Sequence, residues 1–102
     1  MSSPVTKALV VRMTARAETR DEVARFLAGA VDLANAEAGT TVWFALRTDD
    51  STFWIVDAFP SEAERQAHLD GQIAKALLEN AERLLTGAPE ILPADVLAAK
   101  VP

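Results

Sequence analysis

The chain has 102 residues and a formal net charge of −5; half of its residues are hydrophobic and a quarter are charged. This composition is typical of one globular domain with a single core, and it excludes a disordered chain. The sequence has no cysteine and only one histidine, His68, which excludes disulfides, thiolate metal sites and, within one chain, multi-histidine metal sites.

The distribution of charged and apolar residues also bears on partners and location. Lysine and arginine are scattered among the acidic residues, so neither nucleic acid nor an anionic membrane is an expected partner. The first residues lack the long apolar core of a signal peptide, and no apolar run is long enough to span a bilayer. We therefore expect a cytoplasmic protein with one domain over residues 1–102, ordered from about residue 5 to 101 and flexible at residues 1–4.

Residues 5–15 are expected to form a first strand, because the run at residues 9–11 makes its centre apolar on both faces.

A helix should follow this strand. Thr19 and Glu22 have the spacing of a capping box, in which each side chain satisfies a backbone N–H near the start of a helix. Gly39 supplies a stop signal. Between them, apolar residues repeat at helical spacing, namely Val23, Phe26, Leu27, Ala30, Leu33 and Ala34.

Residues 40–59 hold both tryptophans and three of the four phenylalanines, and we interpret them as a β-hairpin. If Asp49 and Asp50 form a two-residue loop, Trp43 faces Val56 across the strands. Alternation then sorts the side chains onto two largely apolar faces, so both faces should be covered. One face carries Val42, Phe44, Leu46, Phe53, Ile55, Asp57 and Phe59, and the other carries Trp43, Ala45, Arg47, Trp54, Val56 and Ala58.

Two further helical segments and a strand are expected after the hairpin. The S-E-A-E run at residues 61–64 repeats the capping-box spacing and opens a short helix, which should be interrupted at residues 70–71. A longer helix is predicted over residues 72–85. The last strand is predicted over residues 91–101, where Pro93 blocks ladder pairing and favours a sheet edge.

The order strand, helix, strand, strand, helix, strand predicts an α+β fold of the ferredoxin-like βαββαβ type. Such a fold has an antiparallel sheet with both helices on one face. The helices leave the other face uncovered, and an uncovered apolar face of this size marks an interface. We therefore expect a homodimer with a two-fold axis, packed sheet against sheet.

Few residues have the chemistry of an active site. His68, late in the short helix, would serve as a general base or as a donor that orients a ligand; alternatively it is a partly exposed helix residue with neither role. Asn80 interrupts an apolar stripe of the last helix that includes Leu77. Pointing inward, Asn80 would hold a carbonyl or phenol oxygen; at an edge, it would reach solvent or a backbone carbonyl.

Two other sets of residues are candidates. Arg12 and Asp57 lie on strands that should be neighbours, where they would form an ion pair that fixes the register. Alternatively, one of them lines a cavity and tunes the ionisation of a substrate. Trp43 and Trp54, with hairpin phenylalanines such as Phe44, would form a slot for a flat aromatic ligand, or pack in the core or the dimer interface.

The aromatic hairpin, the F-P-S-E-A-E run at residues 59–64 and the A-H-L run at residues 67–69 resemble the antibiotic biosynthesis monooxygenase family. The resemblance covers nearly the whole chain, from about residue 8 to 100. This family consists of small dimeric α/β-barrel proteins that include quinol monooxygenases. It implies a homodimer whose sheets close into a barrel, a final strand that reaches toward the partner, and a pocket between helices and sheet.

The resemblance also implies a monooxygenase that oxidises a phenolic, quinol or polyketide-like aromatic substrate with molecular oxygen, without metal, flavin or haem. In such chemistry the substrate carbanion donates electrons to oxygen, so the protein deprotonates the substrate, holds it and excludes water. We expect His68 to transfer the proton or bind a substrate oxygen, and Asn80 and Arg12 to orient oxygen atoms. The expected substrate-binding residues are Trp43, Phe44, Trp54, Asp57 and Leu77.

Some features depart from relatives with known roles. A branch of the superfamily degrades haem with an asparagine, a tryptophan and a histidine. The corresponding positions here are Arg12, His68 and a position near Leu78, so haem degradation is not expected. The chain also lacks tyrosine, which some oxygenating relatives use near the substrate. A non-catalytic small-molecule-binding or stress-related dimeric barrel protein is the main alternative, and a small isomerase or cyclase with one base is another.

Overall fold

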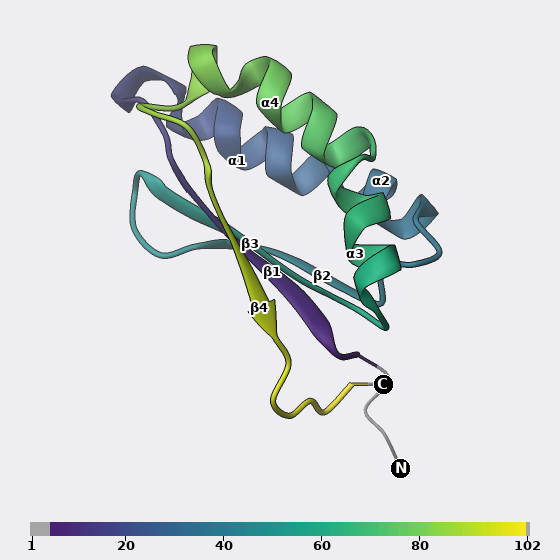
Figure 1. Cartoon of the computed structure of the whole chain (residues 1–102). Coiled ribbons are helices and arrows are strands. Elements are labelled where there is room, and N and C mark those ends of the chain that lie inside the picture. The colour runs from purple at the N-terminus through teal and green to yellow at the C-terminus, as the bar shows by residue number, and fades with distance from the viewer. Residues whose placement is uncertain (1–4, 102) are drawn as a thin grey trace.

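The computed structural model describes residues 5–101, so the flexibility expected for residues 1–4 concerns residues outside this range. Four strands form one antiparallel sheet in the order β2-β3-β1-β4, and the helices lie on one face of it (Figure 1). This arrangement confirms the predicted α+β, ferredoxin-like fold. In chain order the elements are β1 (Lys7–Thr14), the 3-10 helix η1 (Ala17–Thr19), α1 (Arg20–Gly29), α2 (Val31–Ala36), β2 (Val42–Arg47), β3 (Thr52–Phe59), α3 (Glu62–Leu69), α4 (Gln72–Leu84) and β4 (Glu90–Asp95).

The two central strands, β1 and β3, alternate between a helix-facing side and an open side. Every second residue of β3 is buried beneath the helices, whereas the residues between them are partly exposed. β1 follows the same alternation around Leu9, Val11 and Met13, each at most 7% exposed. Because successive side chains of a strand point to opposite sides, this pattern divides each strand between the core and the open face. The predicted grouping of Phe53, Ile55, Asp57 and Phe59 on one face is confirmed, and the structure shows that this is the buried face, which the sequence left open.

The predicted hairpin forms, but its strands pair one position away from the predicted register. Trp43 lies opposite Asp57 instead of Val56. The reason is the turn, which occupies residues 48–51 rather than a two-residue loop. The Asp49 carboxylate accepts hydrogen bonds from two backbone N–H groups of this turn, both at 2.9 Å. Such side-chain bonding to the next backbone groups stabilises a longer turn than the sequence pattern indicated.

The change of register makes the predicted facing of β2 wrong. A shift by one position moves every side chain of a strand to the other side of the sheet. Trp43 and Ala45 therefore face the helices and pack against the core, and the guanidinium of Arg47 lies 4.8 Å from the ring centre of Phe53. The open side instead carries Val42, Phe44 and Leu46 beside Trp54, Val56 and Ala58.

The first predicted helix is divided at Ala30, and its predicted capping box does not form. The Thr19 hydroxyl instead donates to the carbonyl of Leu84 at 2.6 Å. Glu22 forms an ion pair with Arg83 at 2.5 Å. Both contacts join the start of α1 to the end of α4, so the two residues contribute to tertiary packing rather than to a local cap.

The later elements follow the prediction more closely. The predicted break between α3 and α4 is confirmed at residues 70–71. Ser61 contacts the Glu64 carboxylate through its side chain, without the side-chain bond to the backbone that a capping box requires. β4 lies at the predicted sheet edge with Pro93 in it, but the strand ends at Asp95 instead of extending to residue 101 as predicted.

Within residues 5–101, no helix combines the length and apolarity that a membrane span requires.

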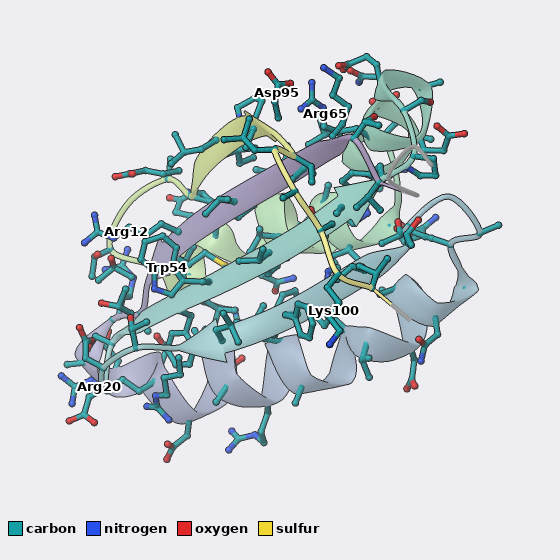
Figure 2. The ribbon with its side chains drawn as sticks, turned by 90° about the horizontal axis from the view of Figure 1, so that it is seen from below. Arg12, Arg20, Trp54, Arg65, Asp95 and Lys100 are labelled. Atoms are coloured by element: carbon teal, nitrogen blue, oxygen red, sulfur yellow. The ribbon has the colours of Figure 1, made fainter. Side chains whose placement is uncertain are left out.

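The side of the sheet away from the helices is largely apolar, as predicted. Phe44, Leu46 and Leu92 on this side are 54%, 47% and 49% exposed. Figure 2 views the molecule from this side, with Arg12 and Trp54 lying next to each other over the central strands. The helix-facing side, by contrast, is covered by α1, α2, α3 and α4 and contains the core (Figure 1). The two sides therefore have different environments although the same strands contribute to both.

Candidate functional site

His68 lies near the end of α3, on the side of this helix that packs against the sheet. Its side chain is 7% exposed, and its ring packs against that of Phe59 with 5.2 Å between the ring centroids. It is the only buried residue of α3, a helix whose other positions are mostly polar. The short helix thus holds an ionisable ring inside an otherwise apolar layer.

Both ring nitrogens of His68 meet a carboxylate. Nε2 lies 2.9 Å from Oδ2 of Asp57, a fully buried residue of β3. This contact has the distance of an ion pair but not the alignment of a hydrogen bond, so neither oxygen of Asp57 has a hydrogen-bonding partner within residues 5–101. On the other side, Nδ1 lies 2.5 Å from Oε1 of Glu37. We call Asp57, His68 and Glu37 the carboxylate–histidine cluster.

The two carboxylates determine the charge of the ring. Burial by itself would lower the pKa of His68, because it removes water from the charged form. The contacts with Asp57 and Glu37 act in the opposite direction and outweigh burial, so the pKa of His68 is raised above its ordinary value. The imidazolium therefore persists to higher pH than in a free histidine, with a carboxylate at each nitrogen.

Glu37 follows the end of α2 and is held against the ring by two other residues. The Thr40 hydroxyl donates to Oε1 of Glu37 at 2.7 Å. Gly71, in the break between α3 and α4, leaves room for the carboxylate, since a β-carbon there would lie 2.9 Å from Oε2 of Glu37. The helix break is therefore part of the site, because a side chain at position 71 would displace Glu37 from His68.

An apolar cavity of about 30 Å³ lies beside the cluster, between the helices and the sheet. A space of this size holds about one or two water-sized molecules. Leu78 and Ile91, which are 59% and 37% exposed, mark where the cavity approaches the surface. Asp57 and His68 are the polar residues of its wall, and the others are Leu9, Val11, Ile55, Leu69, Ile73, Ala74, Leu77, Leu78 and Ile91.

A second hollow lies on the other side of His68. It is an open surface groove of about 300 Å³ with Glu37, Thr40 and His68 in its wall. His68 therefore separates the apolar cavity from the groove, with Asp57 on the cavity side and Glu37 on the groove side. Within residues 5–101, no group of three or more histidine, aspartate and glutamate side chains is arranged to hold a metal ion.

Arg12 lies apart from the cluster, on the open side of the sheet beside Trp54 (Figure 2). Its guanidinium is 3.7 Å from the Glu90 carboxylate and 6.0 Å from the centre of the Trp54 ring. The predicted ion pair of Arg12 with Asp57 is therefore wrong. Their strands are neighbours, as predicted, but Arg12 pairs with Trp54 in register, and Asp57 points to the helices. Of the two residues, Asp57 is the one that lines a cavity.

Asn80 does not join the cluster either. Its amide nitrogen donates to the carbonyl of Ala76 at 2.7 Å, and its amide oxygen accepts from Arg83 at 3.2 Å. Both partners belong to α4 itself, and Asn80 is absent from the cavity wall. The structure thus places Asn80 in the edge position that bonds a backbone carbonyl, and it does not bring Asn80 or Arg12 to His68.

The sheet divides the aromatic residues that were candidates for a single slot. Trp43 faces the helices, and its Nε1 is buried without a hydrogen-bonding partner in the described part of the chain. Phe44 and Trp54 lie on the open side, where Trp54 donates from Nε1 to the hydroxyl of Thr48 at 2.9 Å. The other two expected substrate-binding residues, Asp57 and Leu77, do line the cavity.

Glu37 is the member of the site that the sequence did not reveal. It stands in the A-N-A-E-A-G run at the end of a helix, where no capping or ligand motif marks it. It is 31 positions away from His68 along the chain. Because the contact depends on how two helices end, no local pattern could have identified it.

Comparison with known proteins finds a near relative and several proteins of the same fold. No protein-family model and no curated protein matches the chain. The NE2512 protein of unknown function from Nitrosomonas europaea is 51% identical, covers 99% of this chain and 98% of its own, and has a TM-score of 0.96. An antibiotic biosynthesis monooxygenase is 13% identical (90% of this chain, 99% of that chain, TM-score 0.78). A candidate antibiotic biosynthesis monooxygenase from Nitrosomonas europaea is 10% identical (95% of each chain, TM-score 0.81). The last two share the fold, as the sequence resemblance predicted.

Proposed function

This chain belongs to the family of the NE2512 protein and has the fold of antibiotic biosynthesis monooxygenases, and we propose that it is a cofactor-independent monooxygenase. Its substrate is a phenolic, quinol or polyketide-like aromatic compound. The observation that carries the proposal is the ion pair of Asp57 and His68 in the wall of an apolar cavity. Deprotonation of a weak carbon acid needs a base that takes the proton and a positive charge that stabilises the carbanion, and this apolar wall holds both groups.

Asp57 is the base in this proposal. It is fully buried, and neither of its oxygens has a hydrogen-bonding partner within residues 5–101. Oδ2 lies 2.9 Å from Nε2 of His68, so a proton donor in the cavity meets the carboxylate at Oδ1, which no hydrogen bond within residues 5–101 occupies. Protonated His68, 2.9 Å from Asp57, places positive charge at the same wall and stabilises the substrate anion. The proposal thus assigns proton transfer to Asp57 and charge stabilisation to His68, whereas the sequence suggested His68 for the proton.

The reaction balances without a cofactor. With an anthrone-type substrate, Asp57 removes a proton from the CH₂ group, and the carbanion that remains reduces molecular oxygen as a C–O bond forms. The peroxide anion takes back the proton from Asp57. Asp57 then removes the second hydrogen of the same carbon as a proton while the O–O bond breaks and hydroxide leaves. The hydroxide takes this proton from Asp57, which gives a carbonyl group, one molecule of water and the Asp57 carboxylate. The carbon is oxidised, both oxygen atoms are reduced, and no net proton is released.

The arrangement of His68 supports chemistry without a resident metal. Both of its ring nitrogens are occupied by carboxylates, and the sequence has no other histidine and no cysteine. A metal ion bound by His68 would need one of these nitrogens with its lone pair free. The cluster is therefore arranged to hold a protonated ring rather than to bind a metal.

The substrate needs more space than the cavity of about 30 Å³ provides, because pockets for ligands of this kind measure about 300–1,000 Å³. The cavity reaches the surface between Leu78 of α4 and Ile91 of β4, which are both apolar and partly exposed. Outward movement of these two side chains is the shortest way to widen it. In this arrangement the acidic carbon of the substrate points inward to Asp57.

The open side of the sheet is covered by a second copy of the chain in this proposal. The exposed Phe44, Leu46 and Leu92 support it, because apolar side chains gathered on one face mark an interface. Two such faces related by a two-fold axis bury each other. Sedimentation at micromolar concentration tests this: a dimer is expected, and a monomer at that concentration contradicts it.

Oxygen consumption tests the oxygenase. Purified protein, treated with a chelator and free of flavin, is mixed with anthrone and hydroquinone substrates, and oxygen uptake is followed together with the absorbance of the quinone product. Uptake without added metal or flavin is expected, and Asp57→Asn should slow it by about 10²- to 10⁴-fold. The matched control is Asp95→Asn, which removes an exposed carboxylate of the edge strand and should leave the rate unchanged. Uptake that depends on added metal or flavin contradicts the proposal.

The small cavity favours one alternative, a non-catalytic protein that binds a small molecule. The same substrates distinguish the two functions. If they quench the fluorescence of the tryptophans in a saturable way while no oxygen is consumed, the chain is a binding protein. If saturable binding and oxygen uptake occur together and Asp57→Asn abolishes only uptake, the oxygenase is supported.

A further inference from the structure

One imidazole in contact with two carboxylates raises a question that the proposed reaction does not answer. Asp57 alone is enough to remove the substrate proton, yet Glu37 approaches the opposite nitrogen of His68 to 2.5 Å. The two carboxylates lie in different places. Asp57 is fully buried at the cavity, whereas the Glu37 side chain is 22% exposed and lines the surface groove. They are therefore not equivalent partners.

The difference matters once Asp57 has taken up the substrate proton. Asp57 is then neutral, and the buried imidazolium loses the counter-charge on its cavity side. Burial favours the neutral form of a histidine, so His68 would tend to release a proton at the moment when the substrate anion needs its positive charge. A second carboxylate that the substrate does not reach prevents this loss.

Glu37 has the position that this role requires. It contacts Nδ1, the nitrogen that points away from the cavity, and the Thr40 hydroxyl donates to the same Oε1 atom at 2.7 Å. Gly71 leaves the space that the second oxygen of Glu37 occupies. The carboxylate is thus fixed from the groove side and is separated from the cavity by the histidine ring itself.

We propose that Glu37 is a positioning residue that keeps both nitrogens of His68 protonated while Asp57 carries the proton of the substrate. This inference rests on the proposed function. It gives the two carboxylates different roles, since Asp57 exchanges a proton with the substrate and Glu37 holds the charge of His68 throughout the reaction. Glu37 is not a catalytic residue, because it does not line the cavity.

In the part of the chain that the structure describes, two carboxylates contact the ring. Asp57 faces it from β3 and Glu37 from the end of α2, while Glu64 of α3 lines the same groove and contacts Ser61. Lys7 of β1, on the helix-facing side of the sheet, is paired with a carboxylate of β4. Glu64 therefore offers a matched control, being a carboxylate of the same groove that does not touch His68.

A nuclear magnetic resonance titration of the ring protons tests the proposal, and the sequence makes it simple because His68 is the only histidine. Asp57→Asn reproduces the neutral state of Asp57 after proton uptake. In this variant His68 is expected to remain protonated at neutral pH. Adding Glu37→Gln should move the titration of His68 to lower pH, whereas adding Glu64→Gln should not. If the double variants with Glu37→Gln and Glu64→Gln titrate at the same pH, the proposal is overturned.

Two further measurements separate a positioning role from a purely structural one. In the wild-type background, Glu37→Gln should lower kcat by about tenfold with little change in KM, because the lost interaction stabilises charge that develops during the reaction. If Glu37→Gln does not fold, Thr40→Val, which removes the hydroxyl that holds Glu37, should move the titration of His68 in the same direction. An unchanged titration in a folded Thr40→Val protein then counts against the proposal.

The outcome does not depend on finding a substrate. The titration reports the charge of His68 whether or not the protein consumes oxygen. Failure of the proposed function appears as absent oxygen uptake in the wild-type protein. Failure of the role proposed for Glu37 appears as a His68 titration that does not respond to Glu37→Gln, so the two failures are distinguishable.

Discussion

The two sides of the sheet each carry a group of charged side chains, and the two groups differ in burial more than in residue type. On the helix side, Asp57 is fully buried and lies 2.9 Å from His68. On the open side, the side chains of Arg12 and Glu90 are 46% and 59% exposed and lie 3.7 Å apart. Water screens the exposed pair, whereas the buried charges have only each other, so removal of one partner has different consequences on the two sides.

The largest effect is expected when the buried pair is broken. Asp57→Ala leaves the imidazolium of His68 without its partner at the cavity, and the free energy of unfolding should fall by about 3–5 kcal/mol. Urea denaturation followed by circular dichroism measures it. Glu90→Ala, the same change on the open side, should cost about 0–1 kcal/mol at a protein concentration at which the chain is monomeric and the open side meets water. Similar losses in both variants would remove the distinction between the two sides.

Above pH 6.5, the pH dependence of the free energy of unfolding should come from the helix side. The pKa of His68 is raised in the folded protein, so its stabilising contribution is complete below the unfolded value of about 6.5 and is lost as pH rises through the folded value. Between those two values the free energy of unfolding should fall by up to about 1.4 kcal/mol per pH unit. Urea denaturation at a series of pH values above 6.5 measures this slope.

His68→Gln supplies the control for that slope. The variant has no group that titrates at position 68, so its stability should stay flat over the same range. Among residues 5–101, the other groups with shifted pKa values are Asp49, Glu64 and Asp95. Their pKa values are lowered, so they act at acid pH. A slope that persists in His68→Gln would show that another group is responsible.

The smallest effect is expected for Arg12. Arg12→Ala removes an exposed ion pair and a contact of 6.0 Å with the Trp54 ring, and should change stability by about 0–1 kcal/mol. The difference should shrink as salt is added, because exposed charges are screened. Unfolding at low and high salt and at one protein concentration measures it. A loss comparable to that of Asp57→Ala would place Arg12 in a buried environment that the single chain does not have.

The hairpin shows why the sequence predicted one strand correctly and the next incorrectly. The division of the β3 side chains between two faces follows from strand alternation alone, whereas the sequence left open which face lies against the helices. β2 has apolar residues on both sides, so its pattern does not distinguish between two registers one position apart. The turn decided between them, because the Asp49 carboxylate binds backbone N–H groups of a longer loop than expected.

The capping motifs failed for a related reason. Thr19 and Glu22 have the spacing of a local cap, but each finds a partner on α4, Leu84 and Arg83 respectively. The Leu84 carbonyl also accepts from the Arg16 N–H, so the contact avoids the cost of leaving the buried Thr19 hydroxyl unpaired. The local motif therefore gave way to a tertiary contact that the sequence does not show.

The sequence by itself determined the order of the elements, the ferredoxin-like fold, the edge position of β4 and the apolar open side, since these follow from periodicity and composition. It also singled out His68 and Asp57, but it placed Asp57 beside Arg12. Only the tertiary structure decided that Asp57 and Glu37 meet the two nitrogens of His68. The reason is physical: ion pairs and hydrogen bonds act over a few ångströms. The partner that a side chain finds therefore depends on which side of its strand faces the helices and on where the neighbouring helix ends.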